Sequence, residues 1–492
     1  MLANALFLLA LAPAFQDLPS FEKTVTEHRL DNGMTFLIVE RHEVPVVSFH
    51  LYADVGSVDE EIGQTGMAHM FEHMAFKGTP DIGTRDYARE KEALDRVDEA
   101  YRRLREAKRE KKPDPARIEE LERAFRAAEA EAGEYAASDE FTKVIEQAGG
   151  SGLNASTSND ATRYYISLPS NKAELWFSLE SARFLDPVLR EFYKERDVVM
   201  EERRMRVESQ PVGKLVSNML SLAYRAHPYG REGIGWRSDL ENLTRWQAQE
   251  FFEKHYVPAT LTAVIVGDVD PKQAVAWAES YFGRLPKRER AEPVLTEEPV
   301  QEGPRSTTVH AQSQPVLLIG YHKPSAIDAD DAVFDAVQDI LSGGRTSRIY
   351  RSLVQEKRIS AGAGGFPGFP GNKYPNLFLF FSFPAPGHDN DENEKAMLAE
   401  VERLKTELVT EEELSRVKAR ARADLVDGLD SNSGLASQLA VYHVLTGDWR
   451  NLFRRLEAID RVTREDIQRV AKEYFTEANR SFAYLVPAEG GE

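Results

Sequence analysis

Three side chains with metal-binding or acid–base chemistry lie within five residues of one another, in the stretch GMAHMFEHMAFKGT from Gly66 to Thr79. The stretch is apolar and contains no proline, which favours a helix. Residues four apart lie on one face of a helix, so His69 and His73 can bind one zinc ion together. Glu72 precedes the second histidine, where its carboxylate can reach a water molecule on that metal. The alternative is a core helix with two hydrogen-bonded histidines and a solvated glutamate.

A catalytic zinc site needs a third protein ligand, which must come from elsewhere in the chain. The best candidate segment is EFYKERDVVMEERRMRVE, residues 191–208, whose Glu, Arg and Met content favours a helix. Glu195 and Glu202 are seven residues apart and therefore share a helical face. Glu202 can bind the zinc, and Glu195 can accept the N–H of a zinc-binding histidine. Glu201 is the competing ligand, and solvated surface glutamates are the plainer interpretation of the whole set.

The HMFEH and KERDVVMEERR segments together resemble the pitrilysin/insulinase family of zinc metallopeptidases, which are inverzincins. The resemblance is closest to the half-length bacterial members that are similar to mitochondrial processing peptidase. It implies that Glu202 is the third ligand of one zinc ion per chain. It also implies that Glu195 contacts a zinc-binding histidine without binding the metal itself. Further stretches follow in the family's order and extend the resemblance over nearly the whole chain after about residue 20: GGSGLNASTSNDATRYYISLP, HPYG, FFEKHYVPATLTAVIVGDVD and SGGRTSRIYRSL.

The composition excludes several classes of protein. With 492 residues and 42% hydrophobic side chains, the chain can bury large cores and is too long for one ordinary domain. It contains no cysteine, which excludes disulfides, cysteine catalysis, thiolate zinc sites and a lipoprotein anchor. The formal net charge of −19 argues against nucleic acid as a partner, because phosphate contacts need clustered Lys and Arg. An acidic surface is compatible with basic peptide substrates.

The first residues, MLANALFLLALAPAF, resemble a secretory signal peptide that spans residues 1–15. The apolar run is too short to cross a bilayer, and no later segment is long and apolar enough to do so. We therefore expect a periplasmic or secreted protein without a transmembrane helix. The run has no preceding Lys or Arg, so an uncleaved N-terminal helix and a cytoplasmic location are the alternative.

Residues 86–141 predict an inserted helical hairpin. Apolar residues recur at spacings of three and four on both sides of KKPDP, Lys111–Pro115, and proline interrupts helices. An antiparallel hairpin returns the chain close to its starting point, so the insertion leaves the zinc site intact. A solvated protrusion is the plainer interpretation, and a docking arm for a partner subunit or a rim of a substrate chamber is the alternative.

The expected fold class is α+β, with two similar domains that each pack a mainly antiparallel β-sheet against helices. The resemblance implies the fold of LuxS and the processing peptidases. An N-terminal zinc-binding peptidase domain would span residues 20–284, a linker residues 285–304, and a C-terminal peptidase-like domain residues 305–492. The linker is rich in proline and charge. The second half repeats a strand-then-helix order in QPVLLIGYHKP and DADDAVFDAVQDILSGG but has no histidine pair, so we expect metal only in the first.

The stretch LNASTSNDATRYYISLP corresponds in the family to a strand with a free edge beside the zinc, to which a peptide can add. The resemblance implies that Asn154 and Ala155 contact the substrate, whereas a plain hairpin is the alternative. Family members often bind the substrate main chain with an Arg and a Tyr from the second domain or from a partner subunit. Lys373 and Phe380 stand in roughly those places here. We therefore expect a homodimer or a heterodimer whose other chain supplies the Arg–Tyr pair; alternatively, the zinc domain alone holds the substrate.

These residues together predict a zinc metalloendopeptidase. Bound zinc lowers the pKa of its water, and Glu72 takes the proton as general base and returns it to the leaving amine. In the family, two half-length chains or halves enclose a chamber, which implies unfolded peptides or oligopeptides as substrates. Three alternatives stay open: a zinc-bearing subunit that is active only with a partner, a binding or assembly subunit that does not cleave, and a metal-dependent hydrolase of non-peptide substrates.

Overall fold

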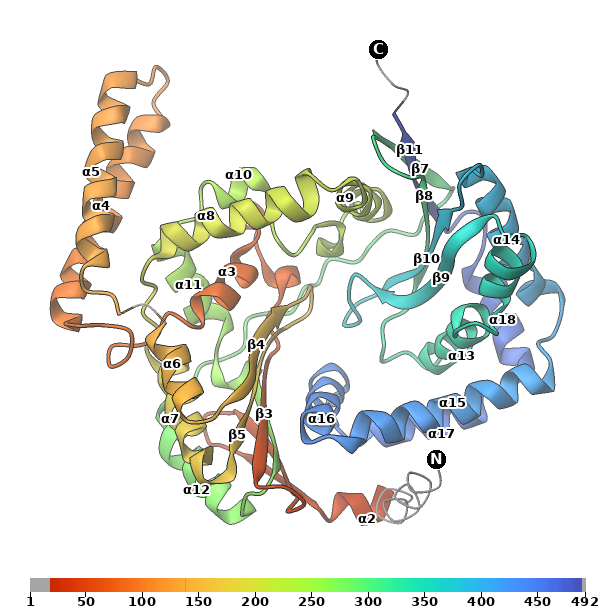
Figure 1. Cartoon of the computed structure of the whole chain (residues 1–492), viewed down its shortest axis with the longest axis horizontal. Helices are drawn as coiled ribbons and strands as arrows, with labels where there is room; N and C mark the ends of the chain where they lie inside the picture. The colour runs from red at the N-terminus through yellow and green to blue at the C-terminus, as the bar shows by residue number, and fades with distance from the viewer. Residues whose placement is uncertain (1–17, 138, 489–492) are drawn as a thin grey trace.

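The structure is a computed structural model that describes residues 18–137 and 139–488 (Figure 1). The expected signal peptide, residues 1–15, lies outside the described residues. Within those two ranges, none of the helices combines the length and hydropathy that a bilayer crossing needs.

The first sheet lies in the half of the molecule that holds the HMFEH stretch, and six strands of the described chain form it. In spatial order they are β1 (Val25–Arg29), β2 (Thr35–Glu40), β6 (Leu261–Gly267), β3 (Val46–Ala53), β5 (Thr162–Pro169) and β4 (Ser151–Thr157). The β2–β6 pair is parallel and the other pairs are antiparallel. Every residue of β6 is buried, because helices cover both faces of the sheet.

The second sheet repeats this order with five strands of the described chain. They are β7 (Arg305–Ala311), β11 (Arg480–Pro487), β8 (Val316–Lys323), β10 (Asn376–Pro384) and β9 (Ser360–Phe369). The β7–β11 pair is parallel and the others are antiparallel, as in the matching strands β2, β6, β3, β5 and β4. The expected α+β fold with two similar sheet-and-helix units is therefore confirmed.

Helices cover both faces of each sheet. Those of the first half are α2 (Leu18–Glu22), α3 (Met67–Met74), α4 (Tyr87–Lys108), α5 (Pro115–Gly133), α6 (Glu140–Gln147), α7 (Ala173–Leu185), α8 (Phe192–Arg203), α9 (Pro211–Ala223), α10 (Arg237–Leu240), α11 (Arg245–His255) and α12 (Pro271–Tyr281). Those of the second half are α13 (Asp331–Ser342), α14 (Asn390–Thr406), α15 (Glu411–Asp430), α16 (Asn432–Thr446), α17 (Asn451–Arg461) and α18 (Arg464–Tyr474).

One helix from each half packs on the sheet of the other half. Helix α16 of the second half packs on β3 and β6, where Leu435 and Leu439 meet Val264 and Val266. Helix α9 of the first half packs on β7 and β11 in the same way. The outer face of the first sheet is covered by α3, α7, α8, α11 and α12, and that of the second by α13, α14 and α18 (Figure 1). The exchange of helices ties the two halves together.

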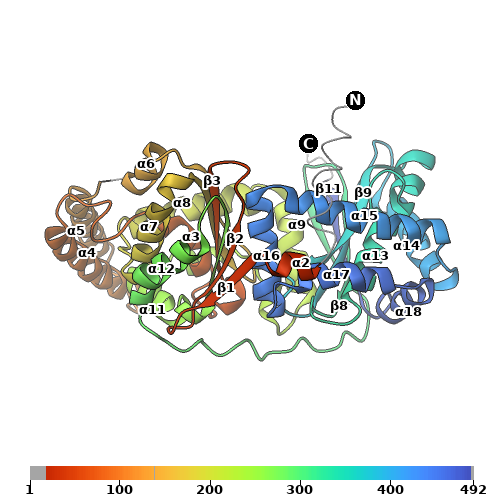
Figure 2. The ribbon, with the colours of Figure 1, turned by 90° about the horizontal axis from the view of Figure 1, so that it is seen from below.

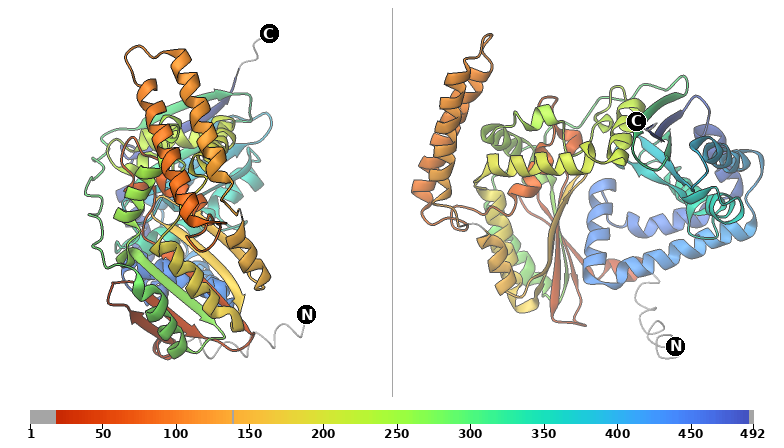
Figure 3. Two further views of the ribbon diagram at one scale, coloured as in Figure 1. Left: turned by 90° about the vertical axis from the view of Figure 1, so that its left-hand side faces the viewer. Right: turned by 45° about the horizontal axis from the view of Figure 1, so that its top comes forward.

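The predicted insertion is a helical hairpin of α4 and α5 that projects from the first half (Figures 1 and 3). Its base is closed by backbone hydrogen bonds, from Arg85 N to Tyr135 O at 2.8 Å and from Ala137 N to Gly83 O at 2.9 Å. The chain therefore leaves and re-enters the first half at nearly one point, which keeps α3 and α8 adjacent despite the insertion.

The segment between the two sheets, residues 286–302, belongs to no helix or strand. Figure 2 shows it running along one side of the molecule from the first half to the second. Its prolines and charges disfavour regular secondary structure, and Val294 packs against the core between α9 and the second sheet. The division into domains at residues 285–304 stays a prediction.

Candidate metal centre

Helix α3 begins at a position that requires glycine. Gly66 has a φ of 91°, and a Cβ there would lie 2.7 Å from the carbonyl oxygen of Ile234. The carboxylate of Glu60 accepts hydrogen bonds from Gly66 N at 2.9 Å and Ala68 N at 2.8 Å, which satisfies amides of the first helical turn. Burial raises the pKa of Glu60 to about 8, although the two amide donors lower it. These contacts fix the start of the helix that carries His69, Glu72 and His73.

Two histidines of α3 and one glutamate of α8 converge on a single point. His69 Nε2 lies 3.7 Å from Glu202 Oε1, and His73 Nε2 lies 3.4 Å from Glu202 Oε2. One potential ligand atom from each residue lies within 4.8 Å of the others. The three side chains are 12–22% exposed, so the point is largely shielded but reachable from solvent.

These residues fit a zinc ion. Ligand atoms 2.0–2.1 Å from a tetrahedral metal lie about 3.3 Å apart, close to the separations seen here. Two imidazoles and one carboxylate form a donor set that suits catalytic zinc and leave a fourth position open.

Glu195 approaches the second histidine from the side away from the convergence point. Its Oε2 lies 3.5 Å from His73 Nδ1, while His73 Nε2 faces Glu202. The contact with Glu195 raises the pKa of His73, whereas burial lowers the pKa of His69. Burial raises the pKa of Glu195, but its contacts with His73 and Lys77 outweigh this and bring the pKa to about 2. A carboxylate on Nδ1 favours a histidine whose Nε2 is free to bind metal.

Neighbouring glutamates on α8 have different surroundings. Glu201 is 52% exposed and its carboxylate binds the guanidinium of Arg204 at 2.5 and 2.8 Å. Glu202 is 14% exposed and also contacts Arg206 Nη1 at 2.5 Å from Oε1. The structure therefore groups Glu202, and not Glu201, with the histidines.

Glu72 lies on α3 beside this cluster and is half-buried. No hydrogen bond or ion pair holds its carboxylate among the residues that the structure describes. An acceptor without a fixed partner, one residue from His73, is available to take a proton near the convergence point.

The strand predicted to bind substrate is an edge strand. Within the described chain, β4 pairs only with β5, and α3 packs against both. Asn154 is exposed and Ala155 is buried. The Asn154 side chain accepts the hydrogen bond of Ala155 N at 2.9 Å. Contact of either residue with substrate stays a prediction.

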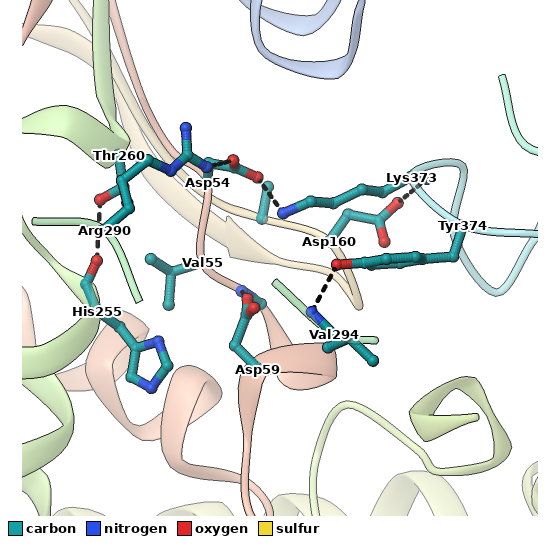
Figure 4. A network of polar contacts seen from close by, with 12 residues as sticks. Asp54, Val55, Asp59, Asp160, His255, Thr260, Arg290, Val294, Lys373 and Tyr374 are labelled. Carbon is teal, nitrogen blue, oxygen red and sulfur yellow. Dashed lines mark hydrogen bonds and ion pairs between the residues drawn. The ribbon is translucent and has the colours of Figure 1, made fainter. Parts of the chain in front are cut away.

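Lys373 and Phe380 are engaged within the chain. Lys373 Nζ lies 2.7 Å from Asp54 Oδ1 at the end of β3, and Arg290 binds the same carboxylate (Figure 4). The backbone amide of Lys373 donates to Asp160 at 3.1 Å. Phe380 lies on β10 and is completely buried in the second core. Lys373 therefore contributes to the contact between the two halves, and Phe380 contributes to the second core.

Sequence reasoning missed three residues beside the cluster: Glu60, Lys77 and Arg206. Lys77 and Arg206 lie four residues after His73 and Glu202, a helical spacing that could have indicated them. The role of Glu60 depends on a chain reversal before α3 that no local pattern signals.

Comparisons with known proteins identify the family of the chain. The protein-family model described as Insulinase (Peptidase family M16) matches residues 35–103 and 129–235 of the sequence. A second family model, described as Peptidase M16 inactive domain, matches residues 242–421. The chain therefore belongs to peptidase family M16, the insulinase family. The gap between the first two matched ranges falls in the α4–α5 hairpin.

Similar proteins span most of the chain. The zinc protease PqqE of Helicobacter pylori is 29% identical over 472 residues, which cover 93% of this chain and 92% of that protein. The crystal structure of a protease from Helicobacter pylori is 27% identical, has a TM-score of 0.78 and covers 94% of this chain and 99% of its own. The first half of the periplasmic protease PqqL from Escherichia coli, at 18% identity and a TM-score of 0.69, covers 94% of this chain and 92% of its own and shares the fold.

Proposed function

We propose that the chain is a zinc-dependent endopeptidase in which His69, His73 and Glu202 hold one zinc ion. The observation that carries this proposal is the convergence of the three side chains from two helices that lie far apart in the sequence. Membership of a peptidase family and relatives named zinc proteases support it. The intact set of histidines and glutamates argues against a subunit that has lost the ability to cleave.

The described side chains suggest a role for each residue in peptide hydrolysis. Bound zinc would polarise a peptide carbonyl and acidify a water molecule. Glu72 accepts the proton from that water and delivers it to the nitrogen of the leaving amine. Glu195 holds His73 so that its Nε2 faces Glu202. The partial burial of the cluster lowers the local dielectric constant and strengthens these interactions.

Unfolded peptides and oligopeptides are the proposed substrates. An extended peptide can add to the edge of β4, beside α3, through main-chain hydrogen bonds. Asn154 would then release the amide of Ala155, which becomes a donor for a substrate carbonyl. Most of the backbone of a folded protein is already paired in its own secondary structure, and a chamber closed by two related halves would exclude it by size.

A second, related chain is the proposed partner. Lys373 is held by Asp54 and Phe380 is buried, so neither is presented as an equivalent of an Arg–Tyr pair. A homodimer or heterodimer would supply that pair from the other subunit. The fold of this chain covers 48% of the full-length PqqL chain, which is compatible with a relative that carries two such halves. A zinc-bearing subunit that is active only with its partner is therefore the second candidate function.

Export to the periplasm is part of the proposal. It is supported by the apolar run of residues 1–15 and by the description of the PqqL protein of Escherichia coli as a periplasmic protease. We also propose that residues 20–284 and 305–492 are the two domains, joined by residues 285–304.

Hydrolysis of peptides of increasing length, beside a folded protein that contains the same sequence, tests the function. We expect cleavage of the longer unfolded peptides, loss of cleavage with a chelator and recovery with zinc, while the folded protein stays intact. Cleavage only after a related second chain is added would select the two-chain alternative. Hydrolysis of small esters without any dependence on peptide length would contradict an endopeptidase.

A further inference from the structure

Lys77 lies four residues after His73, just beyond the end of α3, and its side chain points back to α8. Lys77 Nζ lies 2.5 Å from Glu195 Oε1 and 3.1 Å from Glu191 Oε2. All three side chains are 14–19% exposed. An ammonium group enclosed by two carboxylates at these distances is a charge-assisted contact that solvent screens only weakly.

The Glu195 carboxylate is divided between two partners. One oxygen binds Lys77, and the other lies 3.5 Å from His73 Nδ1. Lys77 thus fixes the rotation of the carboxylate and directs its second oxygen at the imidazole. Without the ammonium group, the carboxylate could turn towards solvent and leave His73 Nδ1 without a partner.

The backbone around Lys77 is held by the residue that precedes Glu191. The guanidinium of Arg190 donates to the carbonyl oxygens of Lys77 and, at 2.9 Å, of Thr79. The Arg190 side chain is 3% exposed, so these contacts are protected from water. The turn after α3 and the start of α8 are therefore joined twice, through the main chain by Arg190 and through the side chain of Lys77.

The start of α8 adopts a backbone conformation that disfavours glutamate. Glu191 has a φ of 56°, in the left-handed region, which costs on the order of 1 kcal/mol for a residue other than glycine. Its carboxylate binds Lys77 and, at 2.9 Å, Lys194. The two lysine contacts hold the Glu191 carboxylate at this left-handed position.

We propose that Lys77 is a positioning residue of the metal centre. It holds Glu195 so that this carboxylate orients His73 and presents His73 Nε2 to zinc beside His69 and Glu202. Lys77 touches neither metal nor substrate and acts only through Glu195. The inference rests on the proposed zinc centre.

Zinc affinity of the purified full-length chain, measured by competition with a chelator, tests this role. Loss of a partner that orients a metal ligand typically costs 10–100-fold in affinity. We expect Lys77→Met to weaken zinc binding by about tenfold or more. Lys194→Met is the matched control, because Lys194 shares Glu191 but is 68% exposed and does not contact Glu195. Its zinc affinity should equal that of the wild type.

A double-mutant cycle with Glu195→Gln separates positioning from general stability. If Lys77 acts through Glu195, Lys77→Met adds no further loss of zinc affinity once Glu195 is replaced. The proposal would be overturned if the two substitutions reduced zinc affinity independently, so that their effects multiplied in the double variant. Wild-type zinc affinity in Lys77→Met would also overturn it. If Lys77→Met does not fold, Lys77→Gln takes its place in the same cycle. Absence of zinc binding in the wild type would instead refute the proposed zinc centre.

Discussion

Glu201 and Glu202 are adjacent in sequence, but helix geometry directs their carboxylates about 100° apart. Glu202 faces the histidines of α3, whereas Glu201 binds Arg204 at the surface. Only Glu202 can complete the donor set unless α8, which packs against α3, rotates.

Glutamine replacements at these two positions should have opposite outcomes. Glu202→Gln removes the charge of the proposed carboxylate ligand, so we expect zinc affinity to fall by at least 10–100-fold. Glu201→Gln leaves the ligands untouched and should bind zinc as the wild type does. Measurement of bound metal after dialysis against a weak chelator compares the two. Retention of zinc by Glu202→Gln and its loss from Glu201→Gln would show that the wrong glutamate has been assigned.

The parts of the site that obey local periodicity could be predicted from the sequence. His69, Glu72 and His73 follow from one helical turn, and the seven-residue spacing places Glu195 and Glu202 on one face. Other contacts depend on how distant segments meet. Glu60 caps α3 because of a chain reversal, and the ion pair of Lys373 with Asp54 joins the two halves, so neither has a local signal.

At the scale of elements, α3, α8 and the hairpin meet at a buried ion pair. Arg190 Nε lies 2.6 Å from Glu90 Oε1 on α4, and the two side chains are 3% and 1% exposed. The same guanidinium binds the carbonyls of the turn after α3. The base of the hairpin is thus connected to both helices of the metal centre. The helical pairing of the hairpin could be predicted from its apolar periodicity, but the ion pair at its base could not, because it joins residues 100 positions apart.

Removal of one partner of this pair should destabilise the protein strongly. Glu90→Gln leaves a buried guanidinium without its counter-charge, and breaking a buried pair costs about 3–5 kcal/mol. We expect a clear fall in the unfolding free energy, measured by urea denaturation. Arg96→Met is the control on the same hairpin, because Arg96 and Glu131 are about half exposed, and its midpoint should not change. Equal stability of Glu90→Gln and the wild type would contradict the structural role of the pair.

At the scale of the whole molecule, the exchange of α9 and α16 makes the two halves one unit. The two-sheet fold could be predicted from repeated strand-then-helix patterns and the family resemblance, but the order of the strands within each sheet could not. The sheet on which α9 or α16 packs could not be predicted, because an amphipathic helix does not specify which sheet its apolar face covers. His50 marks this contact: it lies on β3 and its Nε2 is 2.9 Å from the hydroxyl of Ser433 on α16.

Acid should weaken the contact between the halves. Burial, with a smaller contribution from the charge of Arg163, lowers the pKa of His50 from 6.5 to about 4. Between these values the unfolded chain binds more protons than the folded one, so this group makes stability fall as pH falls from 6.5 to 4. The shift corresponds to roughly 3 kcal/mol. We expect His50→Gln to show a shallower loss of unfolding free energy over this range, and His310→Gln, at an exposed histidine of β7, to retain the wild-type slope. An unchanged slope in His50→Gln would contradict this assignment.

We propose above all that this chain binds zinc and cleaves peptides with Glu72 as the base. The most direct measurement determines zinc content and hydrolysis of an unfolded peptide on the same samples of wild type and Glu72→Gln. We predict about one zinc per chain in both proteins, because the substitution leaves the three proposed ligands unchanged. Hydrolysis should fall by at least 10²–10⁴-fold in the variant. Wild-type activity in Glu72→Gln, or a wild-type chain that takes up no zinc after reconstitution, would contradict the account.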